Sequence, residues 1–133
     1  MTKDAFDDVF GKHFGAPQHS EPSSSEHHYR EYHGKTGNLE HFTYLARNLH
    51  FHHKGFSDAA GHRQTQDILS VGLDQAHHDL NYHFFNHMGS SDADDAYDHL
   101  DETIRRSVRK GSHLSTQSIH DIWHNHDIES HLP

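Results

Sequence analysis

The sequence predicts an all-α protein with four main helices in a bundle, preceded by a short N-terminal amphipathic helix. Apolar residues recur at three- and four-residue spacing in four long segments, which is the pattern of helices with one buried face. Short connections that contain Gly or Ser separate these segments. No long segment alternates polar and apolar residues with a period of two, so a sheet is not expected.

The expected N-terminal helix spans Thr2–Phe14 and places Phe6, Phe10 and Phe14 at i, i+4 and i+8. A polar, serine-rich linker, Gln18–Glu26, follows it. Two roles for the phenylalanines stay open at this point. They can pack against the rest of the chain, or they can bind in the groove of a partner protein.

This change in composition divides the chain into two parts. Residues 1–37 hold the N-terminal helix and the polar linker, and residues 38–133 form the helical bundle domain. At 133 residues the whole chain has the size of one ordinary domain.

The first main helix is expected over Asn38–His53, where Asn38 can cap the N-terminus and Gly55 can stop the helix. A connection over Phe56–Gln64 should follow. The apolar face of this first main helix consists of Phe42, Leu45, Ala46 and Leu49, and His53 continues this face.

The second main helix is expected over Gln66–Met88. At 100° per residue its apolar face is formed by Leu69, Leu73, Ala76, Leu80 and Phe84. His87 falls at the centre of this face and His83 at its edge. The pattern therefore predicts a core-facing pair of histidines at i and i+4.

The third main helix is expected over Ser91–Lys110. Aspartates open it and basic residues close it, which suits the helix dipole. Asp101–Arg105 and Glu102–Arg106 are i, i+4 pairs of opposite charge, so the basic end of this helix has a structural explanation. Gly111 is expected to end the helix.

The last main helix is expected over Ser115–Leu132, with Ser115 or Thr116 as its cap. Ile119, Ile122 and Trp123 form its apolar face, on which His126 also lies. A separate polar stripe on this helix consists of His120, His124, Asp127 and His131.

Composition excludes several classes of function. The chain has a formal charge of −9 with histidine neutral, so it lacks a general field for binding nucleic acid. It has no cysteine, hence no disulfide and no thiolate ligand. No apolar run is long enough to span a membrane, and no secretory leader is recognised, so a cytoplasmic location is expected.

Twenty histidines are the outstanding compositional feature. Imidazole is a common ligand of transition metals, and two histidines at i and i+4 on a helix can bind one ion. The pairs His83/His87 and His120/His124 have this spacing, and together they could supply a four-coordinate site. The expected metal is zinc or another transition metal that suits imidazole ligands, such as nickel, copper or iron.

Two other arrangements of these ligands stay open. One is an interior cluster that adds His53 and His126 to His83 and His87, and the other is the surface stripe that contains Asp127 and His131. Histidines that face the core can instead be satisfied by hydrogen bonds alone. Interior histidines that are neutral when folded would destabilise the protein as they take up protons.

The sequence therefore favours a small, non-enzymatic helical protein that binds a transition metal through paired helix histidines. A first alternative is an assembly subunit or homo-oligomer that uses the Phe6/Phe10/Phe14 helix, because only 31% of the residues are hydrophobic and Tyr44, Phe51 and Phe85 fall off the apolar faces. A second alternative is a metal-dependent enzyme such as a nuclease. The string His124-Asn125-His126 does not support it, since no strands surround it.

Overall fold

The computed structural model describes residues 32–133, and this part of the chain is all-α, with no strand. The expectation of an all-α fold with four main helices is confirmed for these residues. The expected N-terminal helix, including Phe6, Phe10 and Phe14, lies outside them. The helices are α3 (Leu39–Asp58), α4 (Arg63–His83), α5 (Ser90–Lys110) and α6 (Thr116–Asn125), with short 3₁₀ helices η1 (Phe85–His87) and η2 (Ile128–His131).

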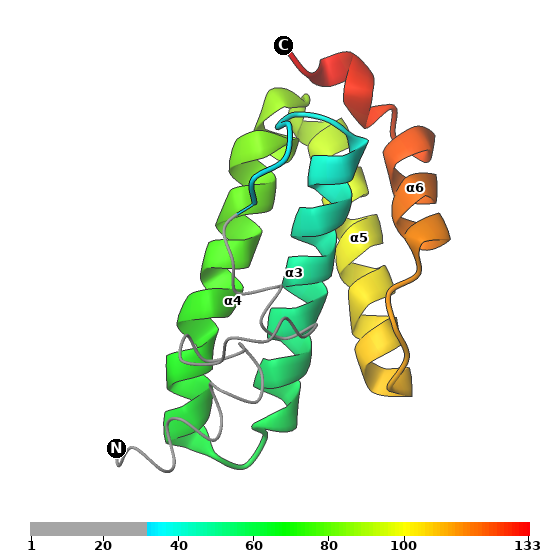
Figure 1. Cartoon of the computed structure of the whole chain (residues 1–133). Helices are drawn as coiled ribbons and strands as arrows, with labels where there is room; N and C mark the ends of the chain where they lie inside the picture. Colours follow the sequence, from blue (N-terminus) through cyan, green and yellow to red (C-terminus); the bar gives the residue numbers. More distant parts are fainter. Residues whose placement is uncertain (1–31) are drawn as a thin grey trace.

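Helix α3 is the centre of the arrangement. It contacts α4, α5 and α6, and α6 also packs against α5. Successive helices run in opposite directions (Figure 1). Helices α4 and α5 also meet, because the hydroxyl of Tyr97 on α5 hydrogen-bonds with His77 on α4. None of the described helices has the combination of length and apolar character that crossing a membrane requires.

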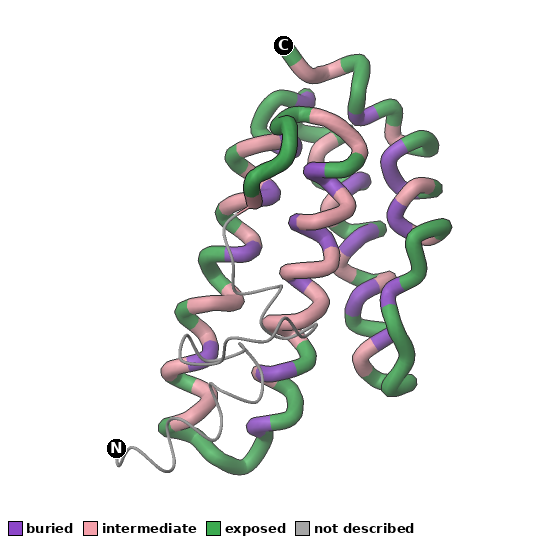
Figure 2. The backbone as a smooth tube through the Cα atoms, in the orientation of Figure 1, coloured by how far each residue is buried: buried purple, intermediate pink, exposed green. Residues whose placement is uncertain are grey.

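The main core is built around aromatic rings. Phe42 of α3 is fully buried, and its ring centroid lies 5.2 Å from that of Phe84 and 5.3 Å from that of Trp123. Such spacings are typical of favourable edge-on and tilted aromatic contacts. Figure 2 shows buried positions recurring along each helix between exposed ones, as the helical period of the apolar residues predicts.

Helix α3 begins as expected but ends later. The side chain of Asn38 accepts a hydrogen bond of 2.9 Å from the backbone N–H of His41, so the predicted cap is confirmed. The predicted stop at Gly55 is wrong, because the helix continues through this buried glycine to Asp58. The extra turn places Phe56 against a small second core of Ala59 and Leu69.

Helix α4 ends at His83, five residues before the predicted end at Met88. Neighbouring helical residues point about 100° apart, so a continuous helix would bury Phe84 and expose Phe85. Instead the backbone breaks at Phe84, with φ −132° and ψ −63°, and both rings are buried. The prediction that His87 faces the core is therefore wrong, since His87 lies in η1 and is exposed.

Helix α5 ends and helix α6 begins at the residues predicted from the sequence. Gly111 ends α5 in the left-handed conformation, with φ 67°, and Ser115 caps α6 through its hydroxyl. The predicted continuation of α6 to Leu132 is wrong, because the helix ends at Asn125 and Asp127 adopts a positive φ of 49° before η2. Arg47 of α3 donates a hydrogen bond of 3.1 Å to the carbonyl of Leu114 and so links α3 to the segment just before α6.

Replacing Phe42 with alanine should destabilise the fold strongly. The ring is fully buried among other rings, so its loss leaves a cavity that costs about 3–5 kcal/mol of unfolding free energy. The matched control is Val71→Ala on the outer face of α4, where the side chain is 69% exposed and the expected change is within about 0.5 kcal/mol. Urea unfolding followed by circular dichroism measures both, and equal effects of the two substitutions would contradict the assigned core.

Lowering the pH should also destabilise the fold. Burial lowers the pKa of His52 to about 4, and burial with the neighbouring His83 lowers the pKa of His41. The unfolded chain gains protons below pH 6.5 while these folded histidines stay neutral, so stability is retained above that pH and lost as pH falls toward 4.

We therefore expect the thermal unfolding midpoint to fall by about 5 °C or more between pH 7.5 and 5. The substitution His52→Gln should reduce this slope, and His78→Gln, at an exposed position of α4, should leave it unchanged. A midpoint that stays constant over this range would show that burial of these histidines carries no proton linkage.

Candidate metal centre

One group of three side chains of types that can bind metal ions converges in the described part of the chain. It consists of His53, His77 and Asp101, and one ligand atom from each lies within 4.8 Å of the others. Two imidazoles and one carboxylate form the donor set of several catalytic zinc and non-haem iron sites. We call this group the His–His–Asp cluster.

Each member of the cluster comes from a different helix. His53 lies in the second half of α3, His77 in the second half of α4 and Asp101 near the middle of α5. The side chains of His53 and Asp101 are 12% and 22% exposed, so the cluster is partly shielded from water. Electrostatic interactions are stronger in such a place than on an open surface.

Neighbouring side chains hold the cluster in position. Arg105 donates its Nε–H to Asp101 Oδ2 at 2.8 Å, one helical turn along α5. The other carboxylate oxygen, Oδ1, lies 3.9 Å from His53 Nε2. The hydroxyl of Tyr97 hydrogen-bonds with His77 Nδ1. Outer contacts of this kind fix the orientation of metal ligands in known sites.

The surroundings favour neutral imidazoles. Burial is the largest cause that lowers the pKa of His53, and Arg105 lowers it further. Burial likewise lowers the pKa of His77, against the opposing effect of Asp101. Burial and the nearby Asp101 raise the pKa of Tyr97 to about 12, so its phenol keeps its proton. Neutral imidazole is the form that binds metal ions.

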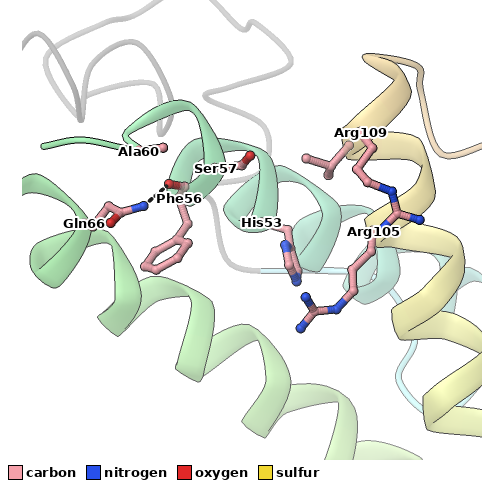
Figure 3. Close-up of a pocket in the computed structure, with 8 residues that line it drawn as sticks. His53, Phe56, Ser57, Ala60, Gln66, Arg105 and Arg109 are labelled. Atoms are coloured by element: carbon pink, nitrogen blue, oxygen red, sulfur yellow. Dashed lines mark hydrogen bonds between the residues drawn. The ribbon is translucent and has the colours of Figure 1, made fainter. Parts of the chain in front are cut away.

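A cleft opens beside the cluster. It has a volume of about 400 Å³ and is lined by residues of α3, α4 and α5 and of the turn after α3: His53, Phe56, Ser57, Ala60, Gln66, Arg105, Val108 and Arg109. Figure 3 shows Arg105 reaching from α5 toward His53, with Phe56 on the α3 side of the same space. The Gln66 amide donates to the backbone carbonyl of Phe56 at 3.0 Å and so links α4 to α3 at the edge of the cleft.

The structure separates His83 from His87. His83 is the last residue of α4, and its ring lies 4.6 Å from the ring of buried His41 in an edge-on contact. His87 lies in η1 and is exposed. Because the helix breaks between them, they do not share the i, i+4 geometry on which the predicted pair depends.

The predicted ligands near the C-terminus are distributed over α6 and η2. His120 and His124 both lie in α6, the first half-buried and the second exposed. His126 Nε2 lies 2.9 Å from Nδ1 of His99 on α5, and His131 Nε2 lies 3.9 Å from a carboxylate oxygen of Asp92. Asp127 is exposed at the break after α6. Within residues 32–133, none of these joins a group of three converging ligands.

Of the cluster, His53 was among the candidate ligands predicted from the sequence, and His77 and Asp101 were not. The usable signals were that His53 continues the apolar face of its helix and that Asp101 pairs with Arg105. No local spacing marks His77, because each helix contributes only one ligand.

Searches with protein-family models, among curated proteins and among solved structures found no match to this chain.

Proposed function

We propose that this protein binds one divalent transition metal ion through His53, His77 and Asp101. The observation that supports the proposal is the convergence of three ligand types from three helices in a partly buried place. The role is the metal-binding one expected from the histidine content, with a different set of ligands. Zinc is the first candidate, since zinc accepts imidazole nitrogen and carboxylate oxygen together.

The three ligand atoms would have to move slightly closer together to bind one ion. Zinc lies roughly 2.0–2.2 Å from nitrogen and oxygen ligands, so ligand atoms around a tetrahedral ion are roughly 3.3–3.6 Å apart. The described ligand atoms are within 4.8 Å of one another. Modest rotations of the side chains would bring them into the first coordination shell.

Some charges near the cluster favour a bound cation and others disfavour it. Asp101 supplies one negative charge, and the lowered pKa values of His53 and His77 keep both imidazoles available near neutral pH. Arg105 orients the carboxylate but repels a cation. We therefore expect one specific site that binds more tightly than the scattered surface histidines, although Arg105 weakens it. Three protein ligands would leave a coordination position for water or another small ligand, on the side where His53 also lines the cleft.

Tyr97 has a defined part in this proposal. In the metal-bound form, Nδ1–H of His77 would donate to the phenol oxygen, which leaves Nε2 to bind the ion. A hydrogen bond from the distal nitrogen of a ligand histidine fixes its tautomer and increases its basicity.

The first test is zinc binding by the untagged chain at pH 7.5, measured by calorimetry in competition with a chelator that suppresses weak histidine sites. His77→Ala or Asp101→Asn should weaken the tight site by a hundredfold or more, since each removes a ligand. The matched control is His78→Ala, which alters the exposed neighbouring histidine on α4 and should change nothing.

The same measurement separates the proposal from the paired-histidine alternatives. Double substitution of His83 and His87, or of His120 and His124, with alanine should leave the tight site intact. Loss of the tight site in either double variant, with binding retained in His77→Ala, would refute the His–His–Asp cluster as the metal centre.

A second prediction concerns Tyr97. The substitution Tyr97→Phe removes the hydrogen bond to His77 and should weaken zinc binding by about tenfold, the effect typical of outer-contact changes at metal sites. Tyr82→Phe on the exposed side of α4 is the control, because Tyr82 is 63% exposed. Equal zinc affinity of Tyr97→Phe and the wild type would show that Tyr97 does not orient a ligand.

A further inference from the structure

The cleft beside the His–His–Asp cluster has an unusual charge for this chain. Its lining includes Arg105 and Arg109 and no acidic residue. The chain as a whole has a formal charge of −9. Arginines concentrated in a hollow on an acidic protein create a local positive field that attracts anions.

The two arginines have hydrogen-bonding capacity left over. The bond that Arg105 makes to Asp101 uses Nε, and within residues 32–133 no hydrogen bond occupies its two terminal amino groups, which can therefore donate to a ligand. No acidic side chain in the described part of the chain forms an ion pair with Arg109. By contrast, the neighbouring Arg106 pairs with Glu102 at 3.3 Å, outside the cleft. Arginine presents paired donors that match the oxygens of a carboxylate or phosphate.

The rest of the lining is apolar or neutral. Phe56 and Val108 are half-buried and form apolar wall, while Ser57 and Gln66 are neutral polar residues. Figure 3 shows the ring of Phe56 and the guanidinium of Arg105 bordering the same space from opposite helices. At about 400 Å³ the cleft lies within the usual size range of small-molecule sites.

We infer that this cleft binds a small organic anion, with its carboxylate or phosphate group on Arg105 and Arg109 and an apolar group against Phe56 and Val108. The inference goes beyond metal binding and does not depend on it, because both arginines carry their charge without an ion in the cluster. Since His53 borders both sites, a ligand in the cleft would lie next to the proposed metal centre.

The test is a titration of chelator-treated protein with phenyl phosphate and with benzoate at physiological salt, followed by two-dimensional NMR that includes the arginine Nε–H signals. Inorganic phosphate and benzyl alcohol test the anionic and the apolar parts separately. We expect saturable shifts at Arg105, Arg109 and Val108 with at least one of the two organic anions. The anion that binds more tightly identifies the preferred head group, and both single probes should bind more weakly.

The matched variants are Arg109→Gln and Arg106→Gln, which remove the same charge from the same helix. Arg109→Gln should weaken binding of the preferred anion by about tenfold, the loss of one charge-assisted contact. Arg106→Gln should change it less than twofold. Circular dichroism checks that both variants are folded.

Equal weakening by the two substitutions would overturn the inference, because it would show a general charge effect. Absence of saturable shifts with both organic anions would also overturn it. Binding of benzyl alcohol as tight as that of the anions would do the same. None of these outcomes alters the zinc experiment, so the two proposals can fail separately.

Discussion

The fold depends on covering helix α3 on several sides with a limited supply of apolar side chains. Only 31% of the residues are hydrophobic, yet α3 contacts α4, α5 and α6. Aromatic rings around Phe42 fill the space near the start of α3, and a smaller group around Leu69 fills the space near its end. Beside these groups, His53 of α3 meets His77 of α4 and Asp101 of α5 in a partly buried place, where polar groups require partners. The candidate metal centre is thus a consequence of how the helices are packed.

The sequence predicted the class of fold and the existence of the four helices well, because helical periodicity and capping residues are local signals. The end of α4 could not be predicted this way. It depends on burial of both Phe84 and Phe85 against other helices, a tertiary effect that overrides continuation of the helix. The cluster was predicted only in part for a related reason. His53, His77 and Asp101 come from three helices, so their proximity depends on helix packing and not on any spacing within one helix.

The two proposed sites share a structural element, the stretch of α5 from Asp101 to Arg109. Successive turns of this helix present a carboxylate toward the histidines and guanidinium groups toward the cleft. Arg105 belongs to both, since it donates to Asp101 and lines the cleft. An anion that neutralises Arg105 would reduce its repulsion of a cation in the cluster, so binding at the two sites would be mutually favourable.

Burial of imidazoles also changes the electrophoretic behaviour of the folded protein. From composition alone the isoelectric point is about 6.1, a value that treats every histidine as if it were in water. In the folded chain the pKa is lowered at His41, His50, His52, His53, His77 and His126, mainly by burial. Fewer of these rings carry a proton near pH 6 than composition implies. The native protein should therefore focus at a more acidic position than the same chain in urea, and the separation between the two bands reports how many imidazoles the fold withdraws from solvent.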